Sequence, residues 1–444
     1  MTATNVPLPA GRRAERTSAQ PSGWVATSIL TEAAFALLNL LWARRRSRPL
    51  ASEPRSIAIL RTGFIGDVIL STGMIRRIRE RHPAARLHYF CYPAARPILE
   101  GHPGLDRVWS PEWFPARSLR DLLRFNVFRK MRQFTREACR EKIDLLLVPC
   151  RQQTLMGALK VWAVVRMIRP RVSVGLSYRN RGQFLDVKVP DEGLLVKHEA
   201  DWCAEVLRAA GIPGDCRTPS VEVGAEPSAA LKRLMSSRGI RPEERLVIIH
   251  PGGGSDASEP KWALKRWPAK NFARVARALG RMKGIRVAIS GIESERPILR
   301  DMMRHGMKGA LDLVGKTTLD DFAALARKAA LVIGNDSGAT HLAAAMGTPT
   351  IALFGYTDFI GYHPLGPQVS VLRQPMPCSP CLYWFDHPPC DKAYRCLRGI
   401  SPREVLSEAT RLLGVNVSIR SADDGTSSVR EAPAEVAGGA FRVS

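Results

Sequence analysis

Acidic residues are scarce in this sequence. Its 444 residues include 41 Asp and Glu against 66 Lys and Arg, which gives a net charge of +25. Such an excess favours a polyanionic partner: nucleic acid, a membrane surface or a phosphorylated small molecule. However, the basic residues are spread over both halves of the chain, and zinc-finger, RNP and basic-zipper patterns are missing. The sequence therefore predicts no nucleic-acid partner.

Other missing signatures exclude further classes. No Gly-x-Gly-x-x-Gly turn follows a predicted strand, which argues against an NAD-linked oxidoreductase. The GKS/T ending of a Walker P-loop does not occur, and no Asp-x-Asp pair is present, so the common divalent-metal route to diphosphate stabilisation is not indicated. No cleavable signal peptide is predicted, because residues 1–23 are polar and no good small-residue cleavage site follows the apolar stretch after them.

The nine cysteines form an odd set with five isolated members, which argues against an extracellular disulfide framework and for a reducing compartment. The other four, in the segment 378–396, have the spacing C-x2-C-x8-C-x5-C: they are Cys378, Cys381, Cys390 and Cys396. A structural zinc site, two disulfides, and free or loosely paired thiols all remain open, and the thiols are favoured.

Residues 24–43 form an apolar stretch of a length that could span a bilayer as a helix. Its polar residues fall within about a 140° arc of a helical wheel, and an arginine cluster follows at 44–48. This pattern predicts an in-plane membrane helix beside anionic headgroups. A helix packed on protein and a true membrane span are the alternatives.

Short aliphatic runs alternate with helical patterns from residue 55 onward, which is typical of parallel βαβ units. The runs are Ser56–Leu60, Leu87–Cys91, Ile143–Val148 and Val172–Leu176, then Leu246–His250, Arg286–Ser290, Ala310–Val314, Leu331–Gly334 and Thr350–Phe354. We predict an α/β protein with two doubly wound Rossmann-like domains, 55–225 and 226–419, facing a central cleft. The last helix begins at a Ser401 cap and ends at Gly414. Residues 420–444 are predicted to be a disordered tail.

Three segments follow strands and carry candidate site residues. The first strand leads into a turn with Arg61, Gly66 and Asp67, where Asp67 is either a group at the cleft or only a helix N-cap. A glycine run that includes Gly253 follows His250, with Lys265 nearby as a positive charge for a diphosphate.

The third segment is the densest motif. After the strand that ends at Gly334, a short helix begins with side chains that could meet an anion at its amino terminus: Asp336, Ser337, Gly338, Thr340 and His341. His341 is expected to be a neutral hydrogen-bonding partner rather than a cation.

Together these segments resemble the ADP-heptose:lipopolysaccharide heptosyltransferases, glycosyltransferase family 9. The resemblance rests on Gly66-Asp67, HPGGG at 250–254, KRWP at 265–268, GNDSGATHLAAAMGTPTIALFG at 334–355 and CLRGISPREV after the cysteines, and it covers about residues 55–415. It implies a GT-B fold with an N-terminal acceptor domain and a C-terminal nucleotide-sugar domain.

The resemblance also implies roles for single residues. Asp67 matches the catalytic base, with Arg61 and Gly66 expected on the acceptor side. Lys265 matches a phosphate-contacting lysine, and Asp336, Ser337, Gly338 and His341 match the donor-binding loop, with Thr340 and Gly253 beside them. Glu295 fits the acidic residue that contacts the ribose, and Glu293 fits it equally well.

The predicted reaction is an inverting, metal-independent transfer of a sugar, most readily heptose from ADP-heptose, to a lipopolysaccharide-core or other lipid-linked acceptor. No cofactor is expected, since the nucleotide-sugar is a substrate. The extra 54 N-terminal residues suggest peripheral attachment to the cytoplasmic face of the inner membrane. The alternative is a catalytically silent sugar-nucleotide-binding or membrane scaffold protein with the same fold.

Overall fold

The computed structural model describes residues 53–114, 125–152, 155–179, 181–223, 226–237, 244–253, 263–381, 390–415 and 441–443. The predicted membrane helix 24–43 and the arginine cluster at 44–48 lie outside these ranges. Among the helices within them, none has the length and apolar character needed to cross a bilayer.

The first sheet consists of six parallel strands in the order β3-β2-β1-β4-β5-β6. They are β1 (Ser56–Leu60), β2 (Arg86–Phe90), β3 (Arg107–Trp109), β4 (Leu145–Val148), β5 (Val172–Tyr178) and β6 (Val187–Asp191). Successive residues of β1 are buried on opposite faces. Ile57 and Ile59 pack with helices α2 (Ile65–Ser71), α3 (Gly73–Arg81) and α8 (Glu199–Ala209), whereas Ala58 and Leu60 pack with α6 (Phe125–Arg140) and α7 (Leu155–Ile168).

The second sheet has the order β13-β12-β11-β10-β7-β8-β9 and is parallel except for β13. Its strands are β7 (Arg245–His250), β8 (Ile285–Ile289), β9 (Leu311–Asp312), β10 (Leu331–Asn335), β11 (Thr350–Leu353), β12 (Val369–Leu372) and β13 (Phe441–Val443). The helices that follow or flank them are α11 (Ala269–Gly280), α12 (Arg296–Arg304), α13 (Leu319–Lys328), α14 (Gly338–Ala345) and α17 (Pro402–Leu413). Short elements are η2 (Pro93–Ala95), α4 (Arg96–Leu99), α9 (Ala229–Ser237), η3 (Glu293–Glu295), α15 (Phe359–Tyr362) and α16 (Arg395–Arg398).

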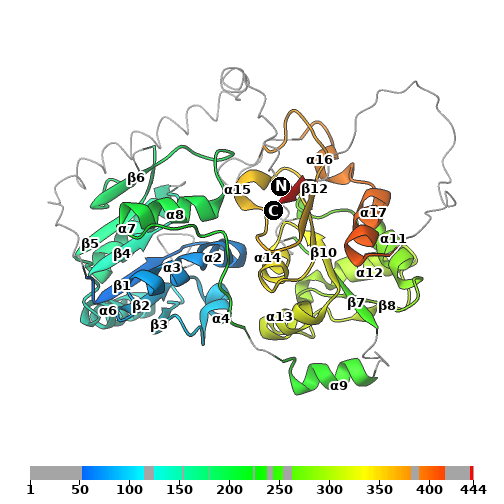
Figure 1. Cartoon of the computed structure of the whole chain (residues 1–444), viewed down its shortest axis with the longest axis horizontal. Coiled ribbons are helices and arrows are strands. Elements are labelled where there is room, and N and C mark those ends of the chain that lie inside the picture. The colour runs from blue at the N-terminus through cyan, green and yellow to red at the C-terminus, as the bar shows by residue number, and fades with distance from the viewer. Residues whose placement is uncertain are drawn as a thin grey trace.

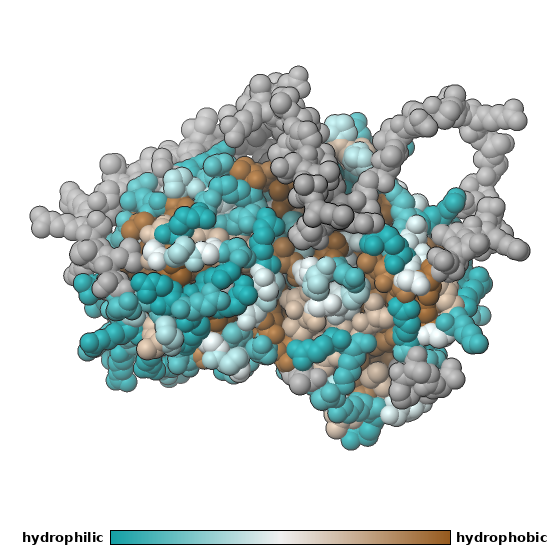
Figure 2. All heavy atoms as spheres, viewed as in Figure 1, coloured by the Kyte–Doolittle hydropathy of each residue, from teal (hydrophilic) through white to brown (hydrophobic). Residues whose placement is uncertain are grey.

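The two sheets lie side by side, and their inner helices meet between them (Figure 1). Helix α2 contacts α14, and α4 contacts α13. One apolar cluster runs through this junction, because it contains Ile57 of the first sheet and Ile248 of the second. In the space-filling view most of the visible face is hydrophilic, and several small hydrophobic patches lie along the junction between the two halves (Figure 2). Packing therefore fixes the carboxyl ends of both sets of strands opposite one another.

Each predicted aliphatic run overlaps a strand, and the Ser401 cap is confirmed: Ser401 Oγ accepts from Glu404 N–H, and Gly414 ends α17 with φ +62°. The sequence did not indicate β3, β6 and β12. The predicted tail 420–444 is described only at Phe441–Val443, which differ from the prediction because they pair with the open edge at β12. The rest of that tail lies outside the described residues.

A histidine links the two halves beside the junction. His198 caps α8: its Nδ1 accepts from Ala200 N–H at 3.1 Å, and its Nε2 lies 3.0 Å from the carbonyl oxygen of His363, beyond α15. The bond at Nδ1 leaves the proton on Nε2, which donates to His363. Burial, aided by His363, lowers the pKa of His198 to about 3.

We expect the free energy of unfolding to decrease as pH decreases, because His198 is held neutral in the folded protein. Its folded pKa lies below the ordinary value of about 6.5, so its contribution is complete above pH 6.5 and is lost as pH falls toward 3. Between pH 7.5 and 5 the wild type should lose about 2 kcal/mol more unfolding free energy than His198→Asn, which keeps a capping acceptor but does not titrate. Urea unfolding at the two pH values measures this. His305→Asn, at an exposed histidine, should behave as the wild type, and an equal pH response in all three proteins would contradict the assignment.

Candidate active site

A cavity of about 740 Å³ lies between the two sheets. Turns that follow β1 and β4 line it from one side, and turns that follow β7, β8, β10 and β11 line it from the other. Carboxyl ends of parallel strands are the usual ligand sites of doubly wound sheets. The cavity is therefore the candidate active site, as the strand pattern predicted.

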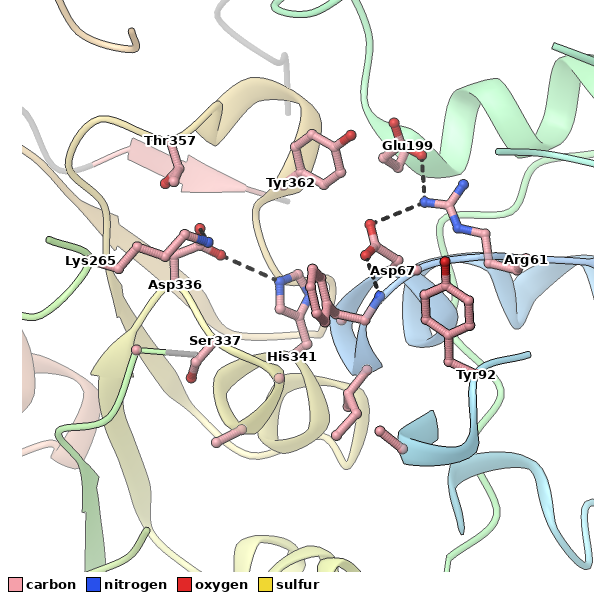
Figure 3. A pocket seen from close by; sticks show the side chains of 18 of the residues that line it. Arg61, Asp67, Tyr92, Glu199, Lys265, Asp336, Ser337, His341, Thr357 and Tyr362 are labelled. Carbon is pink, nitrogen blue, oxygen red and sulfur yellow. Dashed lines mark hydrogen bonds and ion pairs between the residues drawn. The ribbon is translucent and has the colours of Figure 1, made fainter. Parts of the chain in front are cut away.

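Asp67 stands on the first side of the cavity at the third position of α2. Its Oδ2 accepts from Phe64 N–H at 2.7 Å, and its Oδ1 accepts from Arg61 Nη2 at 3.2 Å. Asp67 thus stabilises the helix start from within the first turn rather than as its N-cap. The side chain keeps 22% of its surface exposed and lines the cavity (Figure 3). A Cβ at Gly63 would lie 2.6 Å from Asp67 Cβ, so glycine is needed there.

Arg61 also lines the cavity, but protein groups hold its guanidinium. It is 4% exposed, its Nη1 donates to the Pro149 carbonyl, and its Nη2 also donates to Glu199 at 2.7 Å. Burial opposes the charge of the guanidinium, but Glu199 and Asp67 outweigh this and raise the pKa of Arg61. Arg61 thus contacts Asp67 and Glu199 together, and its predicted contact with an acceptor stays a prediction.

Glu199 continues this row of buried charges. Its second carboxylate oxygen lies 3.7 Å from Arg151, which also pairs with Asp191. Burial disfavours the ionised form of Glu199, yet Arg61 and Arg151 outweigh burial and lower its pKa. Tyr362, on α15 of the other half, also bonds to Glu199. A continuous network therefore connects Asp67 to both halves of the molecule.

The opposite side of the cavity carries a second ion pair. Lys265 Nζ donates to Asp336 Oδ2 at 2.9 Å, and His341 Nε2 lies 3.9 Å from Asp336 Oδ1. Burial acts against the Asp336 carboxylate, but Lys265 and His341 outweigh it and hold the pKa of Asp336 below its usual range. Figure 3 shows Asp336 and Lys265 beyond His341 as seen from Asp67. The three predicted residues are brought together.

Two polar side-chain atoms at the start of α14 lack a partner in the described part of the chain. Ser337 Oγ and His341 Nδ1 are buried and have no hydrogen-bond partner among the residues that the structure describes. Ser337 is the N-cap of α14, so the free N–H groups and partial positive charge of the helix lie beside it. The predicted binding of an anionic group at this helix start stays a prediction, and the helix start has the partial charge that it requires.

Close backbone packing brings the two helix starts together. A Cβ at Gly66 would lie 2.9 Å from His341 Cδ2, and a Cβ at Gly338 would lie 2.9 Å from Ile65 Cγ2. Larger residues at either glycine would push α2 and α14 apart. Gly66 and Gly338 therefore set the separation of Asp67 and His341.

The structure separates the two glutamates that the sequence left equivalent. Glu295 is buried, lines the cavity and accepts from Ile292 N–H at 3.0 Å. Glu293 is exposed and pairs with Arg296. Gly253 also lines the cavity. Thr340 does not: its buried hydroxyl donates to the carbonyls of Asn335 and Ser337 and holds the turn.

Sequence reasoning missed Glu199, Tyr92, Tyr362 and Asp358, which all line the cavity. Asp358 accepts from Leu195 N–H of the other half at 2.9 Å, and burial raises its pKa. The one available signal was His198-Glu199 at a helix start. Such a pair is common where side chains cap a helix, so it does not by itself indicate a functional site.

The four clustered cysteines are free thiols in the structure, with Cys378 exposed and Cys396 buried. Burial raises the pKa of Cys396 to about 11. No group of three or more His, Cys, Asp or Glu side chains is arranged to hold a metal ion within the described ranges, which leave out 382–389 between these cysteines. The segment also supports a wall of the cavity, because Cys381 N–H donates to the Tyr356 carbonyl at 2.9 Å.

Comparison with known proteins gives consistent matches. Residues 131–386 match the family model "Glycosyltransferase family 9 (heptosyltransferase)". The chain is 25% identical over 310 residues to lipopolysaccharide heptosyltransferase 3 of Escherichia coli. The matched region covers 68% of this chain and 84% of that protein.

Two solved structures show the likeness in fold. A family 9 glycosyl transferase from Veillonella parvula superposes with a TM-score of 0.66 at 22% identity and covers 83% of this chain and 99% of its own. The heptosyltransferase WaaC of E. coli, solved with ADP, has a TM-score of 0.57 at 18% identity and covers 80% and 99%. The predicted two-domain GT-B architecture is confirmed.

Proposed function

The chain belongs to glycosyltransferase family 9 and is a glycosyltransferase, and from this premise we propose that it is an inverting, metal-independent heptosyltransferase. Its donor is ADP-heptose, and its acceptor is a lipopolysaccharide core or another lipid-linked glycan. The names of the relatives support the sugar and the acceptor class, and the ADP bound in the WaaC structure supports the nucleotide.

The proposal depends on one observation: Asp67 lies across a single cavity from Asp336, Lys265 and His341. The Asp67 carboxylate takes the proton of an acceptor hydroxyl while that oxygen attacks the anomeric carbon. The bond from the anomeric carbon to the diphosphate breaks on the opposite face, and the nucleoside diphosphate leaves. Attack opposite the leaving group inverts the anomeric configuration.

Charge that develops on the leaving diphosphate meets groups already in place. Lys265 supplies a cation, and the start of α14 supplies N–H groups, Ser337 Oγ and His341. These groups can do the work of a divalent ion, which supports metal independence. We assign Glu295 to the ribose hydroxyls, and its burial at the same cavity supports this assignment.

Asp67, held by two donors and open to the cavity, favours an enzyme over a catalytically silent binding or scaffold protein. A lipid-linked acceptor places the work of the enzyme at the cytoplasmic face of the inner membrane, with attachment through residues 24–48. That segment lies outside the described residues.

A transfer assay tests the proposal. The full chain is incubated with ADP-heptose and lipopolysaccharide acceptors truncated at successive core positions, and products are read by mass spectrometry and anomeric NMR couplings. We expect one heptose on one acceptor, inverted at the anomeric carbon, with the same rate in excess EDTA. UDP-, GDP- and dTDP-sugars serve as control donors. Transfer from one of these instead, or loss of activity in EDTA, would contradict the corresponding part of the proposal.

A further inference from the structure

The outer face of α6 is unusually basic. At about 100° per residue, Arg129, Arg132, Arg136 and Arg140 fall within about an 80° arc of this 16-residue helix. The opposite side packs Phe134 and Ala138 into the core, so the four guanidinium groups point to solvent. Figure 1 places α6 at the outer end of the first domain, away from α14.

These four arginines have no ion pair or hydrogen bond within the part of the chain that the structure describes. The flanks of the helix behave differently: Lys130 pairs with Glu112, and Glu137 pairs with Arg107. Glu137 is the one acidic residue of α6, and it lies at the margin of the basic arc. Among the described residues, none compensates the positive charge of these four arginines.

Two further features extend this face. Phe128 lies at the edge of the arc and is 61% exposed, which is unusual for a large aromatic side chain. The end of α7 lies alongside, because Cys139 Sγ contacts the Met167 carbonyl at 3.1 Å, and it carries exposed Arg166 and Arg169. Basic residues draw a surface to anionic headgroups, and an exposed aromatic side chain can enter the membrane interface beside them.

We propose that this face of α6 docks on anionic lipid headgroups, with Phe128 inserted at the boundary with the acyl chains. A straight helix can lay all four arginines on a flat surface at once, and a phosphate-rich leaflet supplies the missing counter-charges. The surface is separate from residues 24–48 and from the cavity. The proposal goes beyond the transfer reaction, because it holds for any donor or acceptor.

Vesicle sedimentation of the full chain tests the surface. The variant R129Q/R136Q/R140Q removes three charges from the face, and K270Q/R274Q/R281Q removes three exposed charges from α11 and its end. Each basic residue near an anionic surface contributes about fivefold to binding, so the α6 variant should bind phosphatidylglycerol-containing vesicles about 100-fold more weakly. Pure phosphatidylcholine vesicles should not distinguish the proteins. Residues 1–50 are present in all of them, so their contribution cancels.

Phe128→Ala separates insertion from charge. It should weaken binding about tenfold, and the loss should persist at high salt, where charge attraction is screened. Thermal unfolding of each variant checks that the fold is kept, which surface positions should allow. Equal loss in the α11 variant would mean that net charge alone matters, and unchanged vesicle binding together with lost RNA binding would identify a nucleic-acid surface. Either result would overturn the proposal.

Discussion

Asp67→Asn should lower kcat of heptose transfer about 1000-fold, within the range that a positioned general base contributes. The amide has nearly the shape of the carboxylate, so its oxygen can still accept from Phe64 N–H at the start of α2. It cannot take the acceptor proton. Because Asp67 lies on the first domain and the proposed diphosphate groups lie on the second, ADP binding by calorimetry should change less than threefold.

A matched control is available at the opposite end of the same sheet. Asp144 also accepts from backbone N–H groups, at Arg55 and Ser56, but it precedes β4 instead of following a strand. Asp144→Asn should therefore cost some stability and leave kcat near the wild-type value. Turnover by Asp67→Asn within tenfold of the wild type would show that another group removes the proton. A parallel loss of ADP binding would show that the substitution disturbs the whole cavity.

The sequence predicts best those structural features that depend on residues close together in the chain. Strand runs, the Ser401 cap and the helix start at 336–341 are set by neighbouring residues, and all are present in the structure. The position of Asp67 follows from the same logic, because a turn after a buried parallel strand must open at the carboxyl edge of the sheet.

Features that depend on distant segments were not predictable. Glu199, 138 residues further on, accepts a hydrogen bond from the Arg61 guanidinium, and no local pattern indicates that contact. The choice between Glu293 and Glu295 depended on which side chain turns toward Gly252, and no pattern in the sequence carries that orientation. The Thr340 hydroxyl bonds to the backbone of its own turn, a contact that its place in the motif does not reveal.

The two sides of the cavity share one electrostatic design. Each holds a carboxylate in place with a cation, Asp67 with Arg61 and Asp336 with Lys265. The cations differ in their surroundings. Lys265 remains 16% exposed and can turn to a phosphate. Arg61 is 4% exposed, and Glu199 forms a second ion pair with its guanidinium. Because Glu199 pairs with the cation that holds Asp67, removing it should affect Asp67 more than it affects Asp336 or Lys265.

Glu199→Ala should lower the unfolding free energy by about 3–5 kcal/mol, because it leaves Arg61 and Arg151 buried without their shared carboxylate. Glu199→Gln keeps the shape and a hydrogen-bond acceptor and should lose less. Since the folded pKa of Glu199 lies below its ordinary value, its contribution is complete above about pH 4.5 and falls as pH drops further. Urea unfolding at pH 7 and below pH 4 should thus show a smaller acid-induced loss for Glu199→Gln than for the wild type.

The same glutamine variant distinguishes positioning from mere support of the fold. With Glu199 neutral, Arg61 has Asp67 as its remaining carboxylate partner among the described residues, so kcat should fall about tenfold while the ADP dissociation constant stays within twofold. Glu205→Gln is the control on the same helix, since its pair with Lys197 is partly exposed and worth under about 1 kcal/mol. If Glu199→Gln keeps wild-type kcat, the network supports the fold and does not position the base. If kcat falls only in proportion to the folded fraction, the same conclusion holds, because a positioning residue must slow molecules that are fully folded.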